Sequence, residues 1–166
     1  MKVEYMEPFV RAACSVLERI AGGRADRRAL ELLGTTFPTA CMNLAARISG
    51  DLQGEVVYSM SSETAKKLAK LLVGEGIHGF GRMTGKGLAA LGGMLVEATE
   101  ELLGRDGMIC EMGRPTVFQG LNVEFSTADP ALAVSVDTEA GQVDINLAVR
   151  DGRQYQSKND RDSAAA

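Results

Sequence analysis

Few residues in this sequence have the types and spacing that catalysis or metal binding requires. His78 is the only histidine, and the three cysteines, Cys14, Cys41 and Cys110, are far apart and form no CxxC pair. A zinc site needs several nitrogen or sulfur ligands that converge on one point, so we expect no metal site. A Ser-His-Asp triad would have to use His78, which lies in a glycine-rich connection, and we interpret it as an ordinary loop histidine.

Two glycine motifs could in principle bind a nucleotide phosphate. Residues 74–79 read GEGIHG and match G-x-G-x-x-G, but they follow the helical pattern KKLAKLLV rather than a strand. A dinucleotide site needs that loop between a strand and a helix, where backbone amides meet the pyrophosphate. Residues 85–87 read GKG, but Phe80 stands where a P-loop has its first glycine and Gly87 where it has Ser or Thr. We therefore expect no cofactor.

The stretch LAALGGMLVEATEEL, residues 88–102, predicts an amphipathic helix with an unusual centre. Two adjacent glycines lie inside it, and each costs about 1 kcal/mol relative to alanine. At about 100° per residue, one side is an apolar stripe that we expect to be buried, formed by Leu88, Leu91, Leu95, Ala98 and Leu102. The opposite side is small at its centre and charged around it, and it is formed by Lys86, Ala90, Gly93, Glu97 and Glu101.

The remaining pattern predicts the elements that would hold this helix. Helices are expected over residues 3–21, 63–73 and 85–103, the second of them capped by Ser61 or Ser62. Strands are expected over 42–48 and 55–60, over 132–136 and 142–149 as a second hairpin, and as short pieces near 29–33, 108–111, 116–118 and 122–125. The fold class is therefore α/β (α+β), with an antiparallel-rich sheet and two or more long helices packed on it.

The alternation in residues 142–149 predicts a strand with one buried face. Val143, Ile145, Leu147 and Val149 would point to the core, and Asp144, Asn146 and Arg150 to the other side. The strand is long and contains no proline, so it could also lie at a sheet edge and pair with another chain. The competing interpretation places it inside the sheet of a monomer. Residues 151–166 have almost no apolar content, so we predict one domain over 1–150 followed by a disordered tail.

Composition excludes several classes of function. The chain has 166 residues with a formal net charge of -4, and its acidic and basic residues are mixed, so it lacks the basic stripe of a nucleic-acid-binding surface. No apolar run approaches the roughly 20 residues that a membrane span needs. The first ten residues lack the pattern of a secretion signal, and we expect a cytoplasmic protein with no nucleic acid partner and no membrane insertion.

Four segments carry a family resemblance over about residues 1–150. They are MKVEYMEPFVRAACSVLE at the start, ISGDLQGEVVYSMSSETAKKLAKLLVGE, LAALGGM and RPTVFQG. In order, spacing and length they resemble the CheX family, related to CheC, of bacterial chemotaxis phosphatases. The resemblance implies a CheC/CheX-like fold and a phosphorylated CheY-type response regulator as partner. It also implies a homodimer in which the sheets of two chains continue into one another.

The resemblance also assigns the long helix a role. In the family this helix carries Glu-x-x-Asn followed by Met, with a Pro-Pro-Thr segment downstream; the glutamate anchors the helix on the regulator, and the asparagine amide orients the attacking water. Met94 fits the methionine, and Arg114-Pro115-Thr116 fits the downstream segment. The glutamate position then falls on Ala90 and the asparagine position on Gly93, so the resemblance implies that neither catalytic residue is intact.

Three interpretations of this helix face remain open. It can be a docking surface for the regulator without efficient catalysis, which is our first hypothesis. It can belong to an active phosphatase that uses other groups, with Glu97 as the nearest candidate. It can also be a plain solvated face of a domain that interacts with an unrelated partner.

Overall fold

A computed structural model of the chain describes residues 2–74, 81–154 and 161–163. The helical elements are η1 (Val3–Tyr5), α1 (Met6–Ala21), α2 (Ser62–Val73) and α3 (Arg82–Arg105). The strands are β1 (Asp26–Arg27), β2 (Glu31–Leu32), β3 (Thr36–Pro38), β4 (Met42–Gly50), β5 (Leu52–Met60), β6 (Cys110–Met112), β7 (Thr116–Gln119), β8 (Glu124–Ser126), β9 (Leu132–Thr138) and β10 (Gly141–Asp151).

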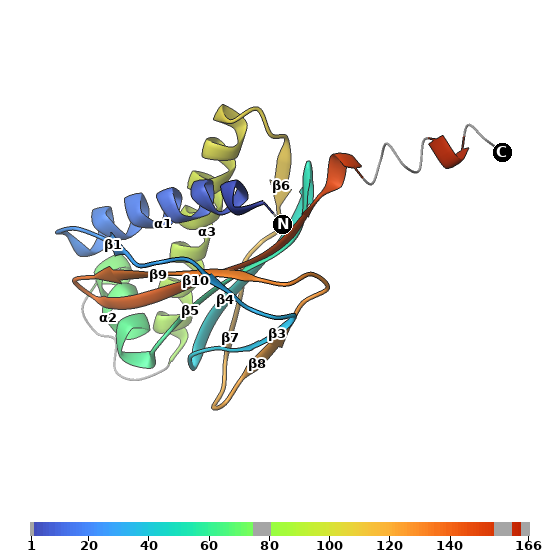
Figure 1. The fold of residues 1–166 in the computed structure, drawn as a ribbon. Coiled ribbons are helices and arrows are strands. Elements are labelled where there is room, and N and C mark those ends of the chain that lie inside the picture. Colours follow the sequence, from blue (N-terminus) through green and yellow to red (C-terminus); the bar gives the residue numbers. More distant parts are fainter. Residues whose placement is uncertain (1, 75–80, 155–160, 164–166) are drawn as a thin grey trace.

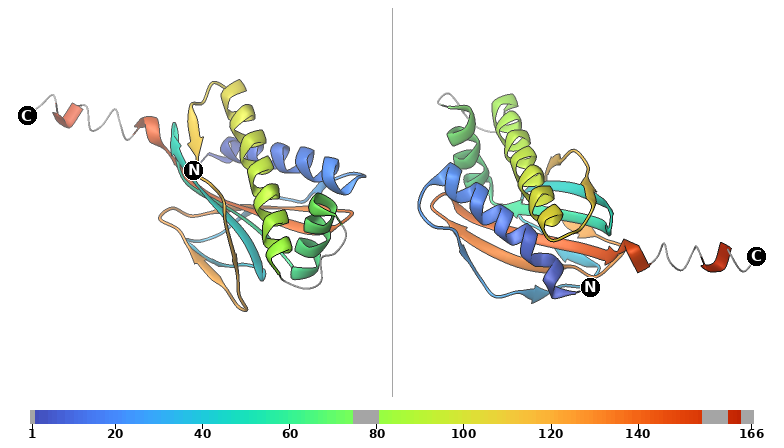
Figure 2. Two further views of the ribbon diagram at one scale, coloured as in Figure 1. Left: turned by 180° about the vertical axis from the view of Figure 1, so that it is seen from behind. Right: turned by 90° about the horizontal axis from the view of Figure 1, so that it is seen from above.

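The strands form one large antiparallel sheet and one small one. The large sheet has the order β1-β9-β10-β5-β4-β6, with β2 also pairing with β9 and β7 with β4. Strands β3 and β8 pair with each other in a separate two-stranded sheet. The helices α1, α2 and α3 lie together on one side of the large sheet, and the β3–β8 pair lies on the other (Figures 1 and 2). The predicted α+β class with an antiparallel-rich sheet and packed helices is confirmed.

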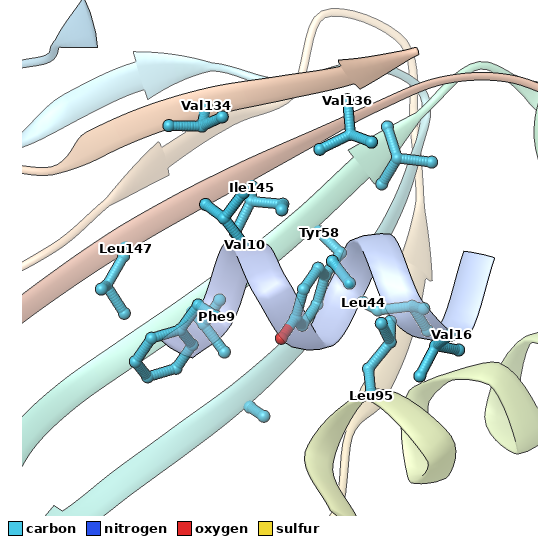
Figure 3. Packing of buried hydrophobic residues seen from close by; sticks show 14 of the residues in the cluster. Phe9, Val10, Val16, Leu44, Tyr58, Leu95, Val134, Val136, Ile145 and Leu147 are labelled. Atoms are coloured by element: carbon cyan, nitrogen blue, oxygen red, sulfur yellow. The ribbon is translucent and has the colours of Figure 1, made fainter. Parts of the chain in front are cut away.

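The main core fills the space between the helices and the sheet. Side chains from α1 and α3, among them Phe9, Val16 and Leu95, point toward strand residues such as Tyr58 and Ile145 (Figure 3). All five side chains are at most 2% exposed. Full burial of each such apolar side chain contributes about 1.5–3 kcal/mol relative to exposure, so this layer supplies most of the driving force for folding.

Strand β10 lies in the middle of the sheet, so the alternative that this strand forms a sheet edge is wrong. It pairs with β5 on one side and with β9 on the other. Its helix-facing residues are buried as predicted, but Asn146 and Ala148 on the opposite side are buried as well. Hydrophobic alternation reports which face of a strand is buried and carries no information about its neighbours in the sheet.

The second side of the sheet has its own small core. Phe37 of β3, Ala131 and Ala148 are buried together, and Phe125 of β8 packs on the ring of Phe37 with a centroid separation of 6.0 Å. Phe125 also stacks on Phe118 of β7 at 5.7 Å. The expectation of a single buried face is therefore wrong where the β3–β8 pair covers the sheet.

The two ends of the domain meet at a hydrogen-bonded cluster. The Tyr5 hydroxyl donates to Oδ2 of Asp151 at 2.6 Å, and the Arg153 guanidinium donates to the same carboxylate at 3.0 Å. Asp151 pairs with Leu52 in the sheet, so β10 runs one residue past the predicted domain boundary. The hydrogen bonds from Arg153 and Tyr5 hold the pKa of Asp151 well below its usual range.

We predict that Asp151→Asn lowers the free energy of unfolding by about 1–2 kcal/mol at pH 7, because a hydrogen-bonded, partly buried carboxylate is replaced by a neutral amide. The folded pKa of Asp151 is lowered, so its stabilisation is present above the unfolded value near 4 and decreases as the pH falls below it. Urea denaturation of both proteins at pH 7, 5 and 3 measures this. A stability difference that stays constant from pH 5 to pH 3 would contradict the prediction.

Candidate partner-binding site

The exposed side of α3 contains all five residues that the sequence assigned to a partner-binding face. Lys86, Ala90, Gly93, Glu97 and Glu101 are each exposed along this 24-residue helix. We call this set the α3 face. Its role in binding is a prediction, whereas its exposure follows from the position of α3, which packs its other side on α1, α2 and the sheet (Figure 2).

The buried side of α3 differs in part from the predicted stripe. Leu88, Leu91 and Leu95 are buried as expected, but Ala98 and Leu102 are only half-buried and line a groove between α1 and α3. Thr99 and Leu103 take the fully buried positions instead. Thr99 can do so because its hydroxyl donates to the carbonyl oxygen of Leu95 at 2.7 Å and is therefore not left without a partner.

The two adjacent glycines of α3 have different surroundings. A Cβ built on Gly92 would lie 2.8 Å from Cβ of Pro115, which is closer than carbon atoms approach in folded proteins. A Cβ built on Gly93 meets nothing within 4 Å. Close packing of the segment before β7 therefore requires Gly92, whereas nothing in the packing requires Gly93.

A third glycine, Gly87, also permits a close approach, here between the backbones of α3 and α2. A Cβ on Gly87 would lie 2.7 Å from Cα of Ala69, so α2 and α3 approach each other through their backbones at this point. The helical patterns of the two segments did not predict this contact. A small residue on the partner helix, here Ala69 in KKLAKLLV, is the only sequence signal that could have indicated it.

The segment Arg114-Pro115-Thr116, which resembles the family's Pro-Pro-Thr motif, lies against α3 at Gly92. Pro115 covers Gly92, while Arg114 and Thr116 are exposed. Met94 is half-buried and packs against the main core. The structure therefore brings Pro115 against Gly92, the residue that precedes the motif positions Gly93 and Met94, although Pro115 is far from them in sequence.

The charges of the α3 face are separated along the helix. Arg82 and Lys86 lie near its beginning, the centre is uncharged, and Glu97 and Glu101 lie toward its end. Two acids of this region are already engaged: Glu101 pairs with Arg105, and Glu100 accepts a hydrogen bond from the Met112 amide at 2.7 Å. No described residue forms a hydrogen bond or ion pair with Glu97.

Several other predicted features give no site. No cluster of His, Cys, Asp and Glu among the described residues has the geometry to hold a metal ion. Residues 75–80, which include His78 and most of the G-x-G-x-x-G match, lie outside the described residues. Cys14 and Cys110 are half-buried, and burial raises the pKa of both thiols, so neither has the character of an activated nucleophile. In the part of the chain that the structure describes, no helix is long and apolar enough for a membrane span.

Comparison with known proteins identifies the fold. The sequence matches no family model and no curated protein. The structure matches a chemotaxis protein CheX from Desulfovibrio desulfuricans with a TM-score of 0.80 and 19% identity, covering 89% of this chain and 100% of that one. CheX from Vibrio vulnificus matches with a TM-score of 0.78 and 14% identity, covering 89% and 100%.

A third match is a complex. The chain matches CheX in a CheX-CheY-BeF3-Mg²⁺ complex from Borrelia burgdorferi with a TM-score of 0.71 and 21% identity, covering 90% of this chain and 99% of that one. These identities are low, so the likeness establishes the CheC/CheX fold of this chain. The resemblance that the sequence segments indicated is thus confirmed at the level of the fold.

The glycine pair gives a matched stability test. We predict that Gly93→Ala stabilises the protein by about 0.5–1 kcal/mol, because it adds a better helix former where the Cβ meets open space. We predict that Gly92→Ala destabilises it by about 1–3 kcal/mol, because overlap with the rigid Pro115 ring outweighs the same propensity gain. Thermal and urea unfolding of both variants decide this, and a Gly92→Ala variant as stable as Gly93→Ala would contradict it.

Proposed function

We propose that this protein is a chemotaxis signalling protein that docks a phosphorylated CheY-type response regulator through the α3 face and has little or no phosphatase activity. The observation that carries the proposal is an exposed helix face with an uncharged, small centre at Ala90 and Gly93, in a chain with the CheX fold. The CheX-CheY complex among the structural matches supports a CheY-type partner.

Low activity follows from the chemistry of dephosphorylation. Attack on an aspartyl phosphate needs a water molecule held in line with phosphorus, and an amide can hold it by donating one hydrogen bond and accepting another. Neither Ala90 nor Gly93 carries a polar side-chain atom, and the sequence contains no Asn or Gln between Gln53 and Gln119. The helix therefore has no amide that could replace the missing one.

The charges of α3 favour a docking surface over a plain solvated face. Helices are stabilised by acids in the first turn and by bases in the last turn. The first turn of α3 has no acid and begins with Arg82, whereas Glu97 and Glu101 lie toward the other end. Arg82 opposes the helix dipole in the first turn, whereas the last turn has a favourable base, Arg105, which pairs with Glu101. The charge at the start of α3 therefore does not serve the stability of the helix.

An active phosphatase that uses other groups is the second candidate. Glu97 is exposed one helical turn after Gly93, and its carboxylate could accept a hydrogen bond from water. A carboxylate also repels the phosphoryl group, so it would position the attacking water less well than an amide does. This candidate requires measurable phosphatase activity that Glu97→Gln abolishes.

We predict that the purified protein accelerates dephosphorylation of a CheY-type regulator weakly or not at all, and that Ala90→Glu combined with Gly93→Asn raises the rate by about 1,000-fold or more. Restored water positioning and anchoring each contribute about 2–4 kcal/mol of transition-state stabilisation. The open space at Gly93 leaves room for the new side chain. Phosphate release from a phosphorylated regulator measures the rate.

Gly93→Ala with Ala90→Glu is the matched control, because it adds bulk and the carboxylate without the amide. A wild-type rate equal to that of an intact family member would overturn the proposal of low activity. A double variant that folds and binds the regulator but gains nothing over the control would show that the catalytic positions are not Ala90 and Gly93.

We also propose a homodimer in the cytoplasm, with the sheets of two chains joined at an edge. Because β10 is central, the joining strand must belong to the β1–β2 edge or to the β6–β7 edge. Leu32 of β2 is 76% exposed, and Ile109 beside β6 is 83% exposed.

We predict a mass of about twice 17.6 kDa by light scattering at micromolar concentration. Leu32→Lys or Ile109→Lys, whichever lies in the interface, should give monomers, because a charge would be buried there. A wild-type mass near 17.6 kDa would contradict the dimer.

A further inference from the structure

We propose that Glu97, the exposed acid one turn after the open position of Gly93 on the α3 face, lowers the preference of this face for the phosphorylated form of the regulator. The inference rests on the proposed docking function and specifies which state of the partner the face selects. It starts from three observations: an open space at Gly93, the exposed Glu97 one turn later, and the lack of any described partner for its carboxylate.

The direction of helical side chains brings the two positions together. In an α-helix the Cα–Cβ bond tilts toward the N-terminus, so a side chain covers the surface of the turn before its own Cα. Glu97 follows Gly93 by four residues, and residues four apart are neighbours on one helix face. No side-chain atom lies within 4 Å of the Cβ position of Gly93, so that space is open to a docked partner, with Glu97 as the next acid on the same face.

The neighbouring acids do not have this freedom. Glu101 is one further turn away and pairs with Arg105. Glu100 is half-buried and accepts a hydrogen bond from the Met112 amide. Glu97 is thus the acidic side chain best placed to present its charge to a partner docked over the centre of the α3 face.

The state of the partner determines how that charge acts. Phosphorylation of the regulator's aspartate adds negative charge at the site that would lie over Gly93. Like charges about 4–6 Å apart repel, with the full screening of bulk water at this exposed face, by an amount that corresponds to about a three- to five-fold change in affinity. Arg82 and Lys86 lie two or more turns before Gly93 and lean away from it, so they do not cancel this repulsion locally. On the proposed docking face, Glu97 thus reduces the advantage of the phosphorylated form.

The test compares Glu97→Gln with Glu101→Gln, both isosteric and both on the α3 face. Binding of a CheY-type receiver is measured by calorimetry with Mg²⁺ alone and with Mg²⁺ plus beryllofluoride, which mimics the phosphoryl group. We expect Glu97→Gln to increase the ratio of activated to unactivated affinity about three- to five-fold, and Glu101→Gln to leave that ratio unchanged. The effect of Glu97→Gln should diminish at 0.5 M salt, because salt screens exposed charges.

Each outcome has a defined meaning. A ratio that Glu97→Gln leaves unchanged, or that Glu101→Gln changes equally, overturns the role of Glu97 while docking stands. Binding of neither receiver state by the wild-type protein or by either variant overturns the proposed function itself. Circular dichroism of both variants verifies that the helix is intact, and the exposed position of both residues leaves the core untouched.

Discussion

The position of α3 depends on two close backbone approaches, at Gly87 and at Gly92. Ala69 of α2 occupies the space beside Gly87, and Pro115 occupies the space beside Gly92, where any larger residue would push these elements apart. Between these contacts Leu88 and Leu91 enter the core. Protein interiors are close-packed, so a shift of even one methyl group at either glycine would be transmitted to the whole helix. The exposed side of α3 is presented in one orientation because the buried side is fixed in this way.

This constraint explains why one glycine of the pair is structural and the other is not. Gly92 faces the Pro115 ring, and its cost in helix propensity is offset by tight packing between α3 and the segment that leads into β7. Gly93 lies about 100° further around the helix, in open space, and there the same cost has no compensating contact. Stability alone does not explain a residue that weakens a helix without improving its packing. Such residues are typical of functional surfaces.

Local patterns predicted the elements, and long-range packing determined what those patterns could not. The hairpins and the helix after Ser61 follow from alternation, turns and caps, and Ser61 does accept the Thr64 amide as a capping residue. The central place of β10 was not predictable, because alternation is the same in an edge strand and a central one that are buried on one side. The burial of Thr99 in place of Ala98 depends on how α1 and α3 pack. The hydrophobic pattern of a helix predicts the direction of its buried side only to within about one residue. The exposed face could be predicted because it lies on the side of the helix opposite the buried Leu88, Leu91 and Leu95.

Stability and proposed function therefore depend on different residues of the same helix. The core side of α3 tolerates little change, whereas Ala90, Gly93 and Glu97 contribute no buried contact in the described structure. A chain with this fold can lose a water-positioning amide from the exposed side without weakening the core. It can also regain one, because the space at Gly93 is open. In the proposed function, such a face changes from catalysis to docking while the sheet and the glycine contacts stay the same. The fold alone does not decide between a phosphatase and a binding protein, and the proposal assigns that difference to the side chains over the centre of α3.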